Sequence, residues 1–274
     1  AIAYPPVEGS DVHLVMDALA QNLPQIFYFS VVPDASLKLL PALASLTKAP
    51  DLESLQMRFL QGDAAGLVKA LQDISEAKPA KVTRVVLQGS KAADGDVMRA
   101  MAHMVMVLPN LGWLEAFQCD IGDFGFEEFS RTLVQEAPKL NLIRFMECNM
   151  GDQGAQALGK VLPLSPALEH LDVCENRAIT DAGGVELLTP LLTSSSSLFK
   201  SMDFSHTGIG NQTAAVLAKL IKNQPLEEIR IRGTNVTNAS VTRLVEACRA
   251  LHRECHIDSE HLDAEHADTE GAKD

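Results

Sequence analysis

The sequence has no excess of basic residues, which excludes several classes of partner. Its 274 residues include 36 acidic and 23 basic side chains, a formal net charge of −13. Phosphate backbones and anionic membranes would repel such a chain unless a local basic patch existed, and the sequence contains no such patch. We therefore expect neither a nucleic-acid partner nor binding to an anionic membrane.

Long apolar runs are missing as well. No run approaches the roughly 20 residues that a membrane-spanning helix requires, and the N-terminus lacks a basic segment followed by an apolar one. We therefore expect a soluble chain with no direct membrane insertion. The sequence begins with Ala1 rather than Met, so removal of a leader or an upstream region is an open alternative.

Cysteines are few, and no two of them form a C-x-x-C pair. The five are Cys119, Cys148, Cys174, Cys248 and Cys255. An odd set with this spacing argues against a disulfide framework and against a zinc ribbon. A reducing compartment fits best, so the expected localisation is intracellular: the cytoplasm, or an organelle if a leader was removed.

What the sequence does contain is a steady internal repeat. The segment LEHLDVCENRAITDAGGVELL, residues 168–188, follows the template L-x-x-L-x-L-x-x-N. The same template starts again, at steps of 27 to 31 residues, at Leu23, Leu52, Val82, Leu111, Leu140, Leu168, Phe199 and Leu226. A helical pattern follows each match, so each unit is predicted to be a strand, a turn and a helix. In this alignment Ile26 of the first unit lies beside Leu55 of the second.

These units resemble the leucine-rich repeat family, and in particular its ribonuclease-inhibitor-like class. Residues 140–162, LNLIRFMECNMGDQGAQALGKVL, and residues 168–188 match that class in the strand, in the Asn or Cys position and in the Gly before the helix. The resemblance covers about residues 23 to 250. It implies an α/β fold: a curved horseshoe solenoid of about eight repeats, with a parallel β-sheet on the concave face and helices on the convex face.

The repeat cannot bury its apolar stripe alone, so the two end units need caps. We expect residues 1–22 to form an N-terminal capping helix region and residues 23–251 to form the leucine-rich repeats. Residues 252–274 are expected to hold a cap strand, within ECHIDSEHL at 254–262, and a flexible acidic tail.

Three residues of the sixth unit raise the question of a catalytic or metal site. His170, Asp172 and Cys174 stand two apart, so in a strand their side chains point to one face. A nucleophilic cysteine also needs a base within reach and an oxyanion hole, and metal ligands must converge on one point. The repeat instead places Asp172 in a solvated row of charges that reads, from one unit to the next, Glu115, Arg144, Asp172, Asp203 and Arg230. We therefore expect no catalytic residue, no metal and no cofactor. Cys119, Cys148 and Asn176 fall on the template's last position, and the two cysteines are expected to be buried.

The outward strand positions of the first five units carry several large apolar residues. Trp113 and Leu142 are neighbours across two strands, as are Phe117 and Met146, so the four should form one patch. Exposed apolar clusters usually mark a protein interface, with Trp a favoured anchor. The predicted partner-binding residues are Trp113, Phe117, Leu142, Met146, Phe59, Val86, Arg144 and Asp172. The alternative is that residues 1–22 fold back over part of this surface.

The leading interpretation is a non-enzymatic protein–protein interaction module or scaffold that binds a protein partner through its concave face. A second follows from similarity in architecture and acidic tail to the Ran GTPase-activating proteins, with Arg58, Arg84, Asn141 or Arg144 acting on the partner. A third is a structural subunit of a large multi-subunit assembly. Fold alone does not decide among them.

Overall fold

The computed structural model describes residues 28–31, 52–58, 64–91, 94–134, 139–194, 198–252 and 254–259. In this part of the chain nine strands form one parallel sheet in the order β1 to β9, each hydrogen-bonded to the next in sequence. The strands are β1 (Tyr28–Val31), β2 (Ser54–Arg58), β3 (Arg84–Gln88), β4 (Trp113–Phe117), β5 (Leu142–Met146), β6 (His170–Asp172), β7 (Ser201–Asp203), β8 (Glu228–Arg230) and β9 (His256–Asp258).

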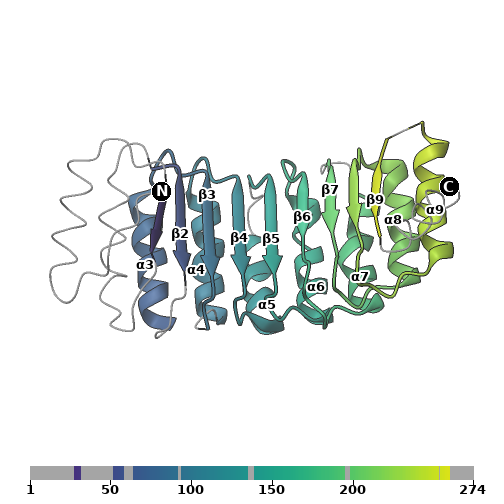
Figure 1. The fold of residues 1–274 in the computed structure, drawn as a ribbon. Coiled ribbons are helices and arrows are strands. Elements are labelled where there is room, and N and C mark those ends of the chain that lie inside the picture. Colours follow the sequence, from purple (N-terminus) through teal and green to yellow (C-terminus); the bar gives the residue numbers. More distant parts are fainter. Residues whose placement is uncertain are drawn as a thin grey trace, which may run out of the picture.

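A helix follows each strand from β2 to β8 and returns the chain to the same edge of the sheet, which keeps the strands parallel. The helices are α3 (Ala64–Ala77), α4 (Gly95–Val107), α5 (Gly122–Leu133), α6 (Asp152–Gly159), α7 (Asp181–Leu188), α8 (Asn211–Asn223) and α9 (Asn238–Ala250). Short 3₁₀ turns follow two of them, at Leu162–Leu164 and Thr189–Leu192. The described helices all lie behind the sheet in Figure 1. We call the opposite side, which corresponds to the predicted concave face, the sheet face.

This arrangement is an α/β leucine-rich repeat solenoid, as the repeat period predicts. The predicted strand positions are confirmed from the second unit onward: Leu55, Val85, Leu114 and Ile143 lie side by side on β2 to β5. The predicted strand within residues 254–262 is also confirmed, because β9 pairs with β8. The predicted cap at residues 1–22 and the acidic tail after β9 lie outside the described residues.

The predicted register of the first unit is wrong by three residues. Phe29, and not Ile26, lies beside Leu55. Residues 26 to 29 read Ile-Phe-Tyr-Phe, so every position of this stretch is a plausible inward residue. Register is specified by alternation of apolar and polar positions, and this run has none.

The core lies between the sheet and the helices, where the template's apolar positions meet the helix faces. Phe145 on β5 is completely buried and meets two rings of α5 edge to face, with centroids 5.0 Å from Phe126 and 5.5 Å from Phe129. Such pairs stabilise beyond the burial of their area. In the described residues no helix is both long and apolar enough to span a bilayer.

Buried side chains at the template's last position hold the strand exits together. The Asn176 amide oxygen accepts hydrogen bonds from the backbone N–H of Cys148, at 2.9 Å, and of Met150, at 3.0 Å. Its amide nitrogen donates to the carbonyls of Phe145 and Val173. The Cys148 thiol likewise donates to backbone carbonyls of β4 and β5, and Cys119 to those of β3 and β4. The prediction that Cys119 and Cys148 are buried is confirmed.

A second periodic device was not predicted: a carboxylate of one helix caps the next helix. Asp123 of α5 accepts from the N–H groups of Gly151 and Gly154 at the start of α6. Asp181 of α7 accepts from those of Gly210, Gln212 and Thr213 at the start of α8. Asp152 and Asn211 do the same for the threonines that precede α7 and α9. The first N–H groups of a helix lack internal partners, so these contacts stabilise each repeat on its neighbour.

Candidate functional site

The side chains of β3 to β6 form three rows across the sheet face, fixed by the strand register. In the first row Trp113 lies between Arg84 and Leu142, with His170 beyond. The middle row is Val86, Glu115, Arg144 and Asp172, and the third row includes Gln88, Phe117 and Met146. The predicted neighbours Trp113 with Leu142 and Phe117 with Met146 are thus confirmed. We call these four residues the apolar patch.

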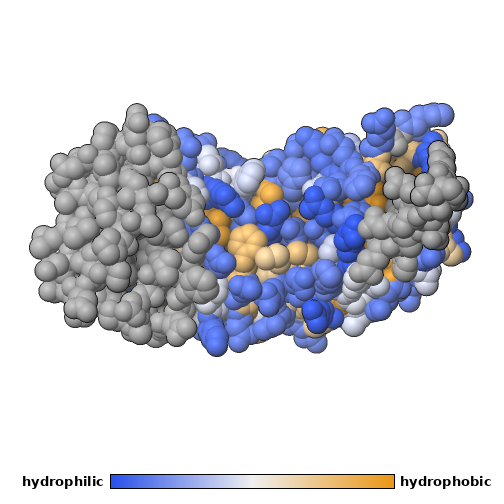
Figure 2. All heavy atoms as spheres, in the orientation of Figure 1, coloured by the Kyte–Doolittle hydropathy of each residue, from blue (hydrophilic) through white to orange (hydrophobic). Residues whose placement is uncertain are grey.

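The members of the apolar patch differ in what they present to solvent. Trp113 is 44% exposed, whereas Leu142 is only 7% exposed and supports its neighbours. Phe117 and Met146 are half-buried. Figure 2 shows apolar side chains over β4 and β5, surrounded by hydrophilic ones. Trp113 is therefore the residue with the most apolar surface to offer.

Val86 and Phe59, two other predicted contact residues, are not part of the apolar patch. Val86 points to the same face but is 1% exposed, so it offers almost no surface to a partner. Alternation along a strand predicts which face a side chain takes, but its exposure depends on the length of its neighbours, which are Gln56 and Glu115 here. Phe59 lies outside the described residues.

A row of ion pairs runs beneath the patch and was predicted only in part. Glu115 is completely buried. Its carboxylate accepts from Arg84 Nε at 2.5 Å and from Arg144 Nη1 at 3.2 Å, while Arg144 Nε donates to Asp172 at 2.7 Å. Burial acts to lower the pKa of Arg144, but the charges and hydrogen bonds of Asp172 and Glu115 outweigh it and raise that pKa overall. The contacts of Arg144 with Glu115 and with Asp172 were predicted. The contact of Glu115 with Arg84 was not predicted.

The same two arginines lie over the aromatic rings of the patch. The guanidinium of Arg84 is 5.6 Å from the centroid of the Trp113 ring, and that of Arg144 is 6.0 Å from the centroid of Phe117. Both distances allow cation–π attraction. Because Glu115 fixes both guanidinium groups, it also fixes the two rings that they cover. The exposed ring of Trp113 thus lies against a guanidinium that is itself held in place.

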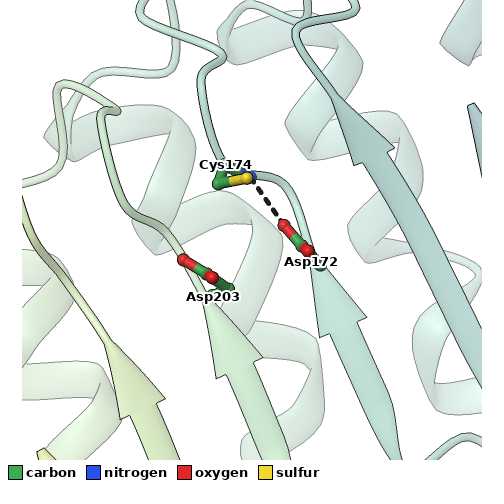
Figure 3. Close-up of side chains that lie close together, drawn as sticks. All are labelled: Asp172, Cys174 and Asp203. Atoms are coloured by element: carbon green, nitrogen blue, oxygen red, sulfur yellow. Dashed lines mark hydrogen bonds between the residues drawn. The ribbon is translucent and has the colours of Figure 1, made fainter. Parts of the chain in front are cut away.

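The three residues that raised the question of catalysis do not assemble a nucleophile and a base. His170 Nδ1 is hydrogen-bonded to Ser201 Oγ at 2.8 Å. Asp172 accepts from the backbone N–H of Cys174 at 3.0 Å, as Figure 3 shows. Burial raises the pKa of the Cys174 thiol far above its usual value, and the charges of Asp172 and Asp203 raise it further. The thiol is therefore protonated at neutral pH, and a protonated thiol is a poor nucleophile.

A different set, Asp172, Cys174 and Asp203, brings ligand atoms within 4.8 Å of one another. The carboxylates already have partners in the protein: Asp172 accepts from Arg144 and from Cys174 N–H, and Asp203 accepts from Ser205 N–H at 2.9 Å. A metal that used all three ligands would also have to remove the thiol proton, which burial and the neighbouring carboxylates hold on Cys174. We therefore assign no metal to this cluster.

A pocket of about 260 Å³ opens on the sheet face between β5 and β8. Its lining includes Leu142 of the apolar patch, Asp172 and Asp203 of the middle row, and Glu228 and Arg230 of β8. We call it the acidic pocket. The repeat alignment places Asp172 and Asp203 side by side in one row, so the sequence contains a signal for this pocket. The row was interpreted from the sequence only as solvated charges.

Comparison with known proteins gives structural neighbours but no family: no family model and no curated protein matches the chain. Solved structures with a similar chain path include an internalin (inlF) from Listeria monocytogenes, at 15% identity and TM-score 0.42, covering 89% of this chain and 69% of that one. Others are the Rad7 and Elc1 complex in yeast (14%, TM-score 0.36, covering 82% and 72%) and the TLR13–ssRNA13 complex (15%, TM-score 0.38, covering 71% and 24%). Likeness at this level assigns neither a partner nor an activity.

Proposed function

We propose that this chain is a non-enzymatic protein-binding module or scaffold that engages a protein partner through its sheet face, with Trp113 as the anchor. The observation that carries the proposal is the 44% exposure of Trp113 on a face where, among the residues whose burial the structure describes, the other large apolar side chains are more buried. Tryptophan and arginine are the residues most enriched at the centres of binding interfaces. Here they are stacked on each other.

The fixed geometry of the patch favours tight binding. Association loses free energy when a mobile side chain must be ordered at the interface. The Trp113 ring lies against Arg84, and Arg84 is held by the buried Glu115. Little ordering therefore remains to be done when a partner covers the ring, so most of the apolar area contributes to affinity.

The charges of the same face support a protein partner rather than a nucleic acid. Carboxylates line the acidic pocket beside the patch, and the arginines nearest to it are engaged with Glu115, Asp172 and Glu228. A phosphate backbone would meet repulsion there.

We also propose that the module is intracellular and belongs to the ribonuclease-inhibitor-like class. Its helices of 8 to 14 residues, longer than one turn, support the class assignment.

The GTPase-activating alternative is less well supported by the geometry. An arginine that acts on a partner's nucleotide must be free to leave its own surface. Arg84 and Arg144 are both bonded to Glu115, and Glu115 is completely buried. Withdrawing either arginine would leave that carboxylate with fewer partners, which costs free energy. The third interpretation, a subunit of a large assembly, remains compatible with a protein-binding face.

The test is site-specific photo-crosslinking in cells of the source organism. A benzophenone amino acid replaces Trp113 in one variant and Phe124 in a matched control, because Phe124 is 62% exposed but lies on helix α5. We expect a protein adduct at position 113 that is missing at position 124. Identical adducts at both positions, or adducts at neither, would contradict the proposal.

A further inference from the structure

The alternation of charge along the middle row of the sheet face fails at one place. From β4 to β9 the row reads Glu115, Arg144, Asp172, Asp203, Arg230 and Asp258. Every neighbouring pair has opposite charges except Asp172 and Asp203, which are direct partners across β6 and β7. Like charges directly opposite each other on a sheet are destabilising. The fold thus keeps an unfavourable pair at this position.

The protein compensates the two carboxylates unequally. Asp172 receives a hydrogen bond of 2.7 Å from Arg144. The nearest cation to Asp203 is Arg230, whose Nη1 is 3.6 Å away and whose other nitrogens bond Glu228 at 2.8 and 2.9 Å. Burial raises the pKa of Asp203, and the neighbouring charge of Asp172 raises it further. Asp203 therefore carries negative charge that the surrounding side chains only partly neutralise.

This charge faces a space that is open to a partner. Asp172 and Asp203 both line the acidic pocket, together with Glu227 and Glu228. The cations of the lining are already paired: Arg144 with Asp172, Arg230 with Glu228, and Lys200 with Glu169 at 2.8 Å. A volume of about 260 Å³ is below the range of 300–1,000 Å³ that is usual for small-molecule sites. It suits one long side chain.

The acidic pocket is continuous with the apolar patch. Leu142 belongs to both, and it is the direct neighbour of Trp113 on β4. Asp172 lies two strands and two residues from Trp113. With strands about 4.8 Å apart and a rise of about 3.3 Å per residue, the two positions are about 12 Å apart. Side chains two to four residues apart in an extended segment span this separation.

We propose that the sheet face binds a polypeptide segment of its partner in which an apolar side chain is followed, two to four residues later, by lysine or arginine. The apolar side chain packs on Trp113 and Leu142. The basic side chain enters the acidic pocket, reaches Asp172 and Asp203, and restores the alternation of charge. This inference rests on the proposed function, because it names the chemistry of the partner for the same surface.

Selection from a random 12-residue peptide library on the full chain tests the proposal. We expect peptides enriched in an apolar residue and a basic residue at this spacing. The same selection is run on Asp203→Asn, which keeps the oxygen that accepts from Ser205 N–H, and on Glu186→Gln, an equal change of charge on the exposed side of α7. Only Asp203→Asn should lose the basic preference while it keeps the apolar one.

A titration then quantifies the effect, with the emission of Trp113, the single tryptophan of the chain, as the signal. A selected peptide without tryptophan is compared with its norleucine version, in which the basic side chain is replaced. We expect the replacement to weaken binding about tenfold for the native chain, a factor in the range of hydrogen bonds to charged groups, and less than about twofold for Asp203→Asn.

Three outcomes separate the two proposals. If selected peptides depend on Trp113 but show no basic preference, or if the preference survives in Asp203→Asn, this inference is wrong and the binding function stands. If no selected peptide depends on Trp113, the proposed function itself fails. If Zn²⁺ alone binds the native chain, fails to bind Asp203→Asn and displaces the peptide, the pocket is a metal site and the inference is overturned.

Discussion

The guanidinium of Arg84 connects the exposed ring of Trp113 on the sheet face with the completely buried carboxylate of Glu115. It lies 5.6 Å from the centroid of Trp113 and donates to Glu115 at 2.5 Å. The arginine is thus fixed from below and covers the ring from one side. This relationship makes the position of Trp113 a property of the free protein.

Replacing Glu115 with glutamine should loosen this arrangement. Arg84 and Arg144 both lose the carboxylate of Glu115, but Arg144 keeps Asp172 and each side chain keeps access to water, at 38% and 33% exposure. We therefore expect the free energy of unfolding to fall by about 1–2 kcal/mol, the lower part of the range for a broken buried pair. The emission of Trp113 should shift because Arg84 is released. Denaturant unfolding measures the free energy and fluorescence measures the emission of Trp113, with Glu186→Gln as the control. If neither changes in the glutamine variant, Glu115 does not hold the two arginines in place.

Asn176 should be essential for stability because it joins adjacent strand exits. Asn176→Ala removes bonds to the backbone of Cys148, Met150 and Phe145 in a completely buried turn. We expect a loss of about 3 kcal/mol or more, since several buried backbone groups become unsatisfied. The matched control is Asn110→Ala, whose exposed amide donates to the carbonyl of Ala80, and which should cost less than about 1 kcal/mol. If both variants lose the same free energy of unfolding in urea, the hydrogen bonds of Asn176 do not hold the strand exits together.

The cap that Asp181 provides for α8 should give a pH-dependent contribution. Burial acts to raise the pKa of Asp181, but hydrogen bonds from Thr213, Gln212 and Gly210 outweigh it, so the pKa is lower than in the unfolded chain. The stabilisation is therefore present above the unfolded value and is lost as the pH falls through the folded one. Asp181→Ala should cost about 1–2 kcal/mol at pH 7, and the difference from the native chain should shrink below pH 4.

Thermal unfolding of both chains from pH 7 to pH 3 measures this difference. A difference in unfolding temperature that stays constant across the range would show that the carboxylate charge contributes nothing to the cap.

The pH-dependent contribution of Asp203 to stability should have the opposite sign to that of Asp181. Its pKa is raised in the folded chain, mainly by burial and also by Asp172, so ionisation of Asp203 costs stability above the folded pKa, and the cost vanishes below the unfolded value. Asp203→Asn should therefore stabilise the chain at pH 7, by less than about 1 kcal/mol because the side chain is only partly buried, and have no effect near pH 3. A destabilised variant at pH 7 would show that Arg230 compensates Asp203 fully.

How far the sequence predicts the structure depends on the local contrast between apolar and polar positions. From Leu52 onward polar residues separate the template positions in most units, and the predicted register is confirmed across six strand pairs. In the run from Ile26 to Phe29 this contrast is missing, and the register was placed three residues too early. The periodic cap by Asp123 and Asp181 was overlooked because it joins residues of adjacent repeats through space.

The site was predictable as a set of neighbours but not as a set of exposures. The rows that bring Trp113 to Leu142 and Arg144 to Asp172 follow from strand register alone. The burial of Leu142 and the position of Arg84 over Trp113 depend on how long side chains lie across a sheet. Spacing along the sequence does not contain that information, because rotamers are selected by the packed neighbours.

The affinity of the partner captured at position 113 tests the central claim most directly. Isothermal titration compares the native chain with Trp113→Ala and Phe124→Ala. We expect Trp113→Ala to raise the dissociation constant at least about 30-fold, as loss of a binding hot spot of about 2 kcal/mol implies, and Phe124→Ala to change it less than about twofold. Both variants should unfold within about 1 kcal/mol of the native chain, since neither ring lies in the core. If Trp113→Ala binds the partner as tightly as the native chain does, the apolar patch is not the binding site.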